Sequence, residues 1–258
     1  GIRTQLQDSQ PADHAPVSLA DIDTARLVTA DTHHQVALPV GTAVQTGVPL
    51  LAEVTRKVAA NVVVAGVDNL HTLTAMLTSL VLNKVDTHLI NFISANAQWE
   101  QLLEPLEEHG LTVQRAITLD STVESFLKEA RARAAEGRDS APQFLVLAGV
   151  HRAKRLDPAN RATTVSDMLH ELLAIGPAVG VHTIMTADGL ASAQSRVQEC
   201  DWHEFGLQVL EASRTNDNQL LFEDHIHAFT QQVHGFAPSE PADIERLINT
   251  VMIHSGRK

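Results

Sequence analysis

The sequence predicts an α/β domain with a mainly parallel, twisted central sheet and helices on both faces. Apolar runs alternate with helical patterns between residues 61 and 187. The runs are continuously apolar, which is typical of parallel strands that are covered on both faces. The segments between them are long enough for the crossovers of repeated β-α-β units. We therefore expect an N-terminal arm and short helix over residues 1–34, then a single domain over 35–258 that ends in a helix.

The strands are predicted from apolar runs bounded by turn residues. The run 34–44 reads as a strand that ends in a glycine-containing turn, and 47–60 as a short strand or a helical turn. The later runs are rich in Val, Ile, Leu and Phe, which favour buried strands. They cover residues 61–66, 87–93, 111–119, 143–150, 181–187 and 204–212.

The helices are predicted from apolar residues at helical spacing and from capping residues. Ser18 is a suitable N-cap for a short helix over 18–27 that follows a loosely attached arm. Gly137 marks the end of the Ala- and Arg-rich helix 121–136. The remaining helices are expected over 70–83, 96–109, 161–175 and, after a Pro-rich turn, within 237–254, whose apolar face contains Ile244, Leu247, Ile248 and Val251.

Charge and cysteine content narrow the class of function. The 258-residue chain has a formal net charge of −12, and its only dense basic stretch is residues 151–155. Binding to duplex DNA depends on neutralising phosphates, so this charge argues against strong autonomous DNA binding and favours a protein partner.

The single cysteine, Cys200, excludes an intramolecular disulfide, which fits a reducing cytoplasm. The longest apolar runs are shorter than the roughly 20 residues that cross a bilayer, so we expect no transmembrane segment.

The segment 61–83 has the organisation of a nucleotide phosphate-binding loop, a buried strand followed by a glycine and a helix. Such a loop requires G-x-x-x-x-G-K-[ST], in which the lysine neutralises phosphate and the hydroxyl holds Mg²⁺. If Gly66 is the first glycine, the second glycine, the lysine and the hydroxyl residue are replaced by His71, Thr72 and Leu73. Asp68, within the loop beside Asn69, would repel a triphosphate. The sequence thus predicts the shape of the loop without its phosphate-binding residues.

Several stretches in order resemble the motor domain of FtsK/SpoIIIE-type P-loop ATPases, a RecA-like family that includes DNA translocases and type VII secretion motors. They are VVVAGVDNLHTL at 62–73, FLVLAGVHRAKRL at 144–156, GPAVGVHTIMTADGL at 176–190, EFGLQVLEASRTNDNQLL at 204–221 and the preceding ALPVGTAVQTGVPLLAEV at 37–54. The match is closest to the degenerate downstream modules of multi-module members. The resemblance implies a RecA-like P-loop fold.

This chain departs from the family pattern at each chemical position. The two acids that hold Mg²⁺ and polarise water in the family are replaced by Ala148 and Gly149, and the polar sensor by Asp188. In the last motif Asp217 matches, but Asn218 and Gln219 follow it. Because the catalytic groups of phosphoryl transfer act mainly through electrostatics, this joint loss predicts a pseudo-ATPase with no catalytic residues and weak or absent binding of ATP and magnesium.

Three other groups of residues are candidates for partner binding, metal binding or nucleophilic chemistry. His151, Arg152, Lys154 and Arg155 are either a contact for a partner or nucleic acid, or solvated charges on an exposed turn. The close pairings among the 14 histidines are His33 with His34, His225 with His227, and His203 with Cys200. A structural zinc site usually combines two close pairs that include cysteines, so we expect no metal site. A Cys200–His203 nucleophile is likewise not expected from closeness in sequence alone.

The residues and the resemblance together favour a catalytically degenerate module that acts in assembly, regulation or substrate recognition of a larger translocation motor. Its expected partners are an active ATPase module in the same chain or another chain, with a homo-oligomer or ring implied by the family. The cargo, DNA or protein, stays open. The expected location is the cytoplasm, or the inner face of the membrane through a larger protein. The alternative is an ATP-dependent DNA or protein translocase with an unorthodox nucleotide site. A third possibility is an unrelated α/β binding protein with a coincidental glycine turn.

Overall fold

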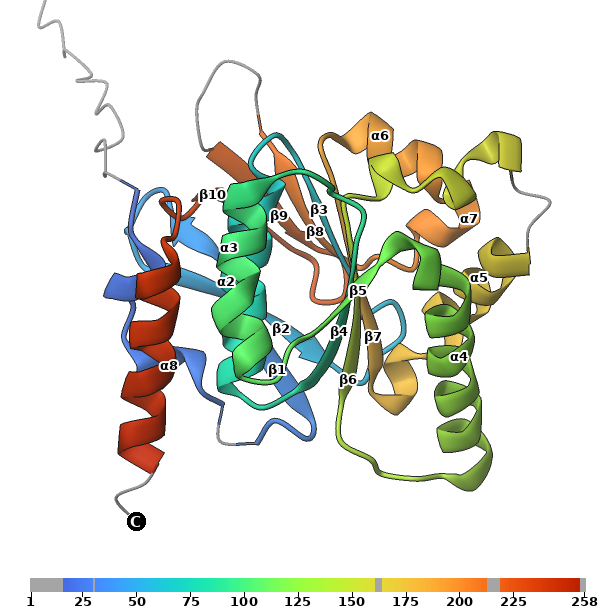
Figure 1. Ribbon diagram of the computed structural model, residues 1–258, viewed down its shortest axis with the longest axis horizontal. Helices are drawn as coiled ribbons and strands as arrows, with labels where there is room; N and C mark the ends of the chain where they lie inside the picture. Colours follow the sequence, from blue (N-terminus) through green and yellow to red (C-terminus); the bar gives the residue numbers. More distant parts are fainter. Residues whose placement is uncertain (1–15, 30, 161–163, 213–218, 256–258) are drawn as a thin grey trace, which may run out of the picture.

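The computed structural model describes residues 16–29, 31–160, 164–212 and 219–255, which are built around a ten-stranded sheet (Figure 1). The order of strands across the sheet is β2-β1-β10-β9-β8-β3-β7-β6-β4-β5. The strands are β1 (Gln35–Ala43), β2 (Pro49–Thr55), β3 (Val62–Ala65), β4 (Asp86–Asn91), β5 (Thr112–Arg115), β6 (Gln143–Ala148), β7 (Val181–Ala187), β8 (Leu207–Glu211), β9 (Gln219–Asp224) and β10 (Phe229–His234).

The described helices follow the strands in the alternation that the sequence predicts. The α-helices are α1 (Thr24–Leu27), α2 (Asn69–Leu82), α3 (Ala97–Glu108), α4 (Leu119–Glu136), α5 (Thr164–Ile175), α6 (Leu190–Arg196), α7 (Glu199–Trp202) and α8 (Pro241–Ser255). Short 3₁₀ helices include η1 (Leu19–Asp21), η2 (Ala116–Thr118), η3 (Val150–Arg152) and η4 (Lys154–Leu156). None of the helices within the described ranges combines the length and apolarity needed to cross a membrane.

The sheet has a parallel part and an antiparallel part that meet at β8. The neighbours from β8 through β3, β7, β6 and β4 to β5 pair in parallel. The neighbours from β8 through β9, β10 and β1 to β2 pair antiparallel. The predicted, mostly parallel α/β sheet is thus confirmed, and the structure extends it by two hairpins that continue one side of the sheet.

Helices cover both faces of the parallel part, as predicted. Along β3, Val62 and Val64 belong to the core under α2 and α3, whereas Val63 and Ala65 belong to the core under α4 and α5. This alternation follows from the opposite directions of successive side chains in a strand. In Figure 1, α2, α3 and α8 stand side by side on one face, and α4 and α5 lie on the other. Burial on both faces explains why the sequence of β3 is uninterruptedly apolar.

Several element boundaries differ from the sequence prediction. The predicted strand 111–119 ends at Arg115, because η2 and α4 begin directly afterwards. The predicted N-terminal helix 18–27 consists of two short pieces, η1 and α1, capped by the side chains of Ser18 and Asp23. The hairpin β9–β10 and the helices α6 and α7 were not predicted. The predicted arm over residues 1–16 lies almost entirely outside the described residues.

Buried polar groups fix the amino ends of the central strands. The Asn61 amide donates to the carbonyl oxygens of Leu173 (3.1 Å) and Glu204 (2.9 Å), and its oxygen accepts from the Thr183 backbone at 2.9 Å. His182 is buried on β7, with Nδ1 2.7 Å from the carbonyl oxygen of Ala60. Burial lowers the pKa of His182 to about 4, so the imidazole is neutral in the native state at neutral pH. Both side chains hold β3 and β7 in register.

Candidate functional site

The three predicted chemical positions lie together at the carboxyl edge of the parallel sheet. They follow β3, β7 and β6, which are neighbours in that order. The Gly66 backbone donates to the carbonyl oxygen of Ala187 at 3.1 Å, and the Gly149 backbone donates to Oγ1 of Thr186 at 3.0 Å. Parallel sheets collect ligand-binding groups at this edge. The structure therefore brings the three predicted positions together at one edge of the sheet.

The turn between β3 and α2 is shorter than a phosphate-binding loop. In the intact motif, the four residues between the glycines are loop backbone that cradles phosphate. Here Gly66, Val67 and Asp68 alone separate the two elements, and α2 begins at Asn69. The Asn69 backbone donates to the Gly66 carbonyl at 3.2 Å, and the His71 backbone donates to the Asp68 carbonyl at 3.0 Å. These amides are already paired within the turn, so they are not available to an anion.

The positions of the missing lysine and hydroxyl residue face the protein interior. Thr72 is 3% exposed, and Leu73 is fully buried in the core beneath α2. Leu70 packs against the same core. Leucine side chains thus fill the space beneath the start of α2. Neither the side chain at the lysine position, Thr72, nor that at the hydroxyl position, Leu73, is exposed at the turn.

The surroundings of the turn are acidic. Asp68 is exposed, and its Oδ1 lies 3.9 Å from Nε2 of His71. Glu211 on the neighbouring strand β8 lies so close that a Cβ added to Gly66 would be 3.2 Å from the Glu211 Cβ. A cavity of about 240 Å³ lies beside the start of α2, lined in part by Asp68, His71, Trp99 and Glu240. Carboxylates around this cavity disfavour a triphosphate.

The position of the metal-holding acids is filled by an apolar contact. Ala148 is fully buried, and Gly149 has a φ of +81°. A Cβ added to Gly149 would lie 2.2 Å from Cδ1 and 2.7 Å from Cγ1 of Ile93. The Phe92 backbone, next to Ile93, donates to the Ala148 carbonyl at 3.0 Å, which fixes this approach. A carboxylate at position 149 would require the Ile93 side chain to move and the residue to adopt a left-handed backbone.

The predicted sensor Asp188 faces the basic segment instead of a nucleotide site. Its backbone donates to Nδ1 of His151 at 3.3 Å, and its Oδ2 lies 3.8 Å from Nε2 of that histidine. Burial lowers the pKa of His151 despite the opposing effect of Asp188. Arg196 on α6 donates to the His151 carbonyl at 2.8 Å and pairs with Asp157 at 2.7 Å. Asp188 is therefore part of a polar cluster that joins β7, η3 and α6.

The predicted basic contact surface is divided by the fold. His151 turns toward Asp188, and Arg155 forms a two-pronged ion pair with Asp120 on α4. Arg152 and Lys154 are exposed, and within the described part of the chain neither lies within ion-pair distance of a carboxylate. Two of the four predicted residues therefore remain free for a partner.

Three residues that shape this edge escaped the sequence reasoning. Ile93 closes the acid position, Glu211 crowds Gly66, and Arg196 supports the His151 segment. In the sequence, Ile93 and Glu211 are recognisable only as residues near the ends of predicted strands. The residues that they contact depend on the order of the strands in the sheet. For Arg196, the sequence shows only a basic residue shortly after the predicted strand 181–187. Asp217 and Asn218 lie outside the described residues, and so does the side chain of Cys200.

Comparison with known proteins identifies the fold. No protein-family model matches the sequence, and no curated protein matches it. The monomer form of the pCW3 conjugation coupling protein TcpA with ATPγS matches with a TM-score of 0.62 at 12% identity, covering 92% of this chain and 76% of that one. ATPases 2 and 3 of EssC from Geobacillus thermodenitrificans match with a TM-score of 0.63 at 11% identity, covering 95% of this chain and 53% of that one.

A type VII secretion protein gives a third match. The cytoplasmic domain of the Thermomonospora curvata type VII secretion ATPase EccC matches with a TM-score of 0.61 at 12% identity, covering 87% of this chain. This chain spans 28% of the EccC structure and 53% of the EssC structure. The likenesses confirm the predicted RecA-like fold of FtsK/SpoIIIE-type ATPase domains.

Proposed function

We propose that this chain, which has the fold of FtsK/SpoIIIE-type ATPase domains, is a catalytically inactive module that acts in assembly, regulation or substrate recognition of a larger translocation motor. The contact between Ile93 and Gly149 carries the proposal, because it occupies the space of a catalytic carboxylate. The short turn after β3, in which the Asn69 and His71 amides are paired, and its acidic neighbours support the same conclusion from the phosphate side. Both changes oppose the electrostatic stabilisation on which phosphoryl transfer depends.

The proposed partner is an active ATPase module, in the same chain or in another chain. Its support is the size relation to EssC and EccC, in which this fold makes up only part of a longer structure. A homo-oligomer or ring is a further possibility for such a module. The net charge of −12 favours a protein cargo over DNA. A motor of this kind would place the module in the cytoplasm, or at the inner face of the membrane through the larger protein.

Nucleotide binding and turnover test the loss of the site. We expect no heat of binding at millimolar ATP with Mg²⁺ by calorimetry, and no phosphate release above the rate of a buffer blank. Asp68→Ala removes the repelling charge, and Thr72→Lys restores the lysine of the motif. Neither variant is expected to gain turnover, because the acid position stays closed. Turnover by the unmodified chain that is lost in these loop variants would establish the alternative, a translocase with an unorthodox site.

Oligomeric state tests the proposed role in assembly. Size measurement by light scattering, with and without Mg-ATP and duplex DNA, separates a ring from a monomer. We expect the result to be independent of ATP and DNA. Association that requires ATP would contradict an inactive module, and a stable complex with DNA would contradict a protein cargo.

A further inference from the structure

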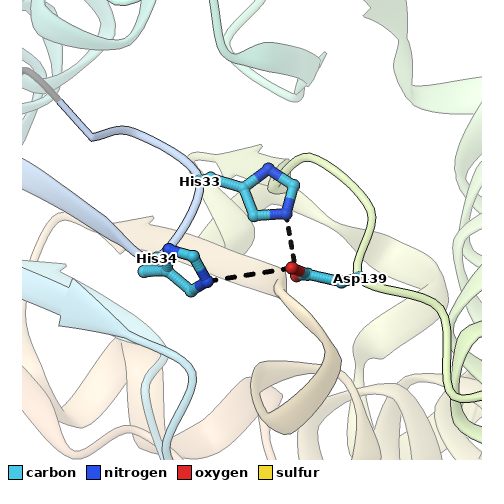
Figure 2. Close-up of side chains that lie close together, drawn as sticks. All are labelled: His33, His34 and Asp139. Atoms are coloured by element: carbon cyan, nitrogen blue, oxygen red, sulfur yellow. Dashed lines mark hydrogen bonds and ion pairs between the residues drawn. The ribbon is translucent and has the colours of Figure 1, made fainter.

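A cluster of three metal-ligating side chains lies at the amino edge of the sheet, away from the candidate nucleotide site. It contains His33 and His34, which precede β1, and Asp139, which lies between α4 and β6 (Figure 2). One ligand atom of each residue lies within 4.8 Å of the others. Nε2 of His33 is 2.7 Å from Oδ1 of Asp139, and Nε2 of His34 is 3.8 Å from Oδ2 of Asp139. Figure 2 shows both rings directed at the carboxylate.

Asp31 contacts the backbone of His33 and the ring of His34. Its Oδ1 accepts a hydrogen bond from the His33 backbone at 3.1 Å, and its Oδ2 lies 3.0 Å from Nδ1 of His34. A histidine that ligates a metal through one ring nitrogen usually donates from the other to a carboxylate or carbonyl. If His34 carries its proton on Nδ1, that N–H donates to Asp31, and the lone pair on Nε2 is available to a metal ion beside Asp139. The cluster therefore has an orienting carboxylate in addition to three ligands.

Arg56 fixes the backbone on both sides of the cluster. Its side chain, 16% exposed, donates to the His33 carbonyl from Nε (3.1 Å) and Nη2 (2.8 Å), and also to the Ser140 carbonyl. Its Nη1 lies 3.4 Å from Oδ1 of Asp139. The guanidinium thereby holds the two chain segments next to each other before any ion binds. Its charge lowers the affinity for a cation, and the carboxylate of Asp31 offsets that charge.

We propose that His33, His34 and Asp139 form a Zn²⁺ site with water as the fourth ligand. Two imidazoles and one carboxylate are ligands that zinc accepts, and three protein ligands plus water is an established coordination. Bonds of about 2.1 Å in a tetrahedron separate ligand atoms by roughly 3.4 Å. The three atoms are already within 4.8 Å, so side-chain rotations of the exposed His34 and Asp139 suffice.

A bound ion at this place would join two parts of the chain that are remote in sequence. It would attach the segment entering β1 to the turn entering β6. β1 belongs to the antiparallel part of the sheet, and β6 to the parallel part. The proposed ion would therefore link the two parts of the sheet, at a place remote from the carboxyl edge.

Calorimetry with Zn²⁺ on the complete, tag-free chain tests the site. We expect saturable binding of one Zn²⁺ per chain, and a visible absorption band of four-coordinate Co²⁺ when Co²⁺ replaces zinc. Asp31→Asn should weaken binding by roughly 10–100-fold, as expected for loss of an orienting partner. His33→Gln and Asp139→Asn should weaken it further. Thermal unfolding in EDTA checks that each variant remains folded.

The turn between β9 and β10 supplies a matched control. His225 and His227 are similarly exposed and lie next to Glu223 and Asp224, but they lack a third converging ligand among the described residues. The double variant His225→Gln/His227→Gln should bind Zn²⁺ with the affinity of the unmodified chain. Absence of saturable binding would overturn the proposal. Binding that survives His33→Gln and Asp139→Asn, or that is lost in the control, would also overturn it.

Discussion

At the carboxyl ends of β3, β6 and β7, the space for chemistry is closed by the contact of Ile93 with Gly149 and surrounded by acidic groups, whereas the amino ends of the same strands hold organised polar side chains. Asn61 and His182 make complete hydrogen bonds inside the protein at that second edge. In α/β sheets, ligand sites normally occupy the carboxyl edge. The comparison teaches that packing and amino-edge hydrogen bonds hold the strand order of this sheet without help from the residues at its carboxyl edge.

The largest expected effect comes from putting a carboxylate back at the carboxyl edge. Gly149→Asp should lower the free energy of unfolding by about 3–5 kcal/mol, because overpacking against Ile93 adds to the strain of a left-handed backbone. Denaturant unfolding measures the change. Gly47→Asp is the control, because Gly47 has a φ of +68° but open space around it, so it should cost only about 1 kcal/mol of strain. Equal costs for the two variants would mean that the edge is open to an acid.

The next effect concerns acid sensitivity at the amino edge. His182 has a native pKa of about 4 against an ordinary value of 6.5. Between these values the unfolded chain binds a proton that the native chain does not. The free energy of unfolding should therefore fall as the pH falls from about 6.5 to about 4, by about 3 kcal/mol in total from this residue.

Unfolding in urea across this pH range isolates the contribution of His182. The free energy of unfolding should change less steeply with pH for His182→Gln than for the unmodified chain. The difference in slope should correspond to at most one bound proton. His203→Gln, at an exposed histidine, serves as the control for the loss of an imidazole at the surface. If the His182→Gln curve ran parallel to the original, the buried imidazole would not be the acid-sensitive group.

The smallest expected change in stability concerns the N-terminal ends of α2 and α3, which lie at the same cavity. The Asn96 side chain caps α3 by accepting from the Trp99 backbone at 3.1 Å, whereas Asp68 makes no such bond at the start of α2. Asn96→Ala should cost about 1 kcal/mol, and Asp68→Ala less than about 0.5 kcal/mol. Thermal unfolding distinguishes them. A larger cost for Asp68→Ala would show that the short turn depends on this carboxylate.

The sequence predicts those elements that depend on residues close together in the chain. Continuous apolar runs predicted β3, β6 and β7, because burial on both faces selects such residues. Gly137 ended α4 as predicted, with its φ of +61°. The hairpin β9–β10 was missed, because its strands mix polar and apolar residues, and their partners come from the sheet.

The sequence by itself determined the parallel α/β core and the residue types that stand at positions 71–73, 148 and 149, because both are read from residue type and local periodicity. The tertiary structure alone decided that Ile93 occupies the space beside Gly149. It also decided that His33 meets Asp139, a residue 106 positions away. Such contacts depend on strand order and helix packing, which bring together segments that no local pattern connects.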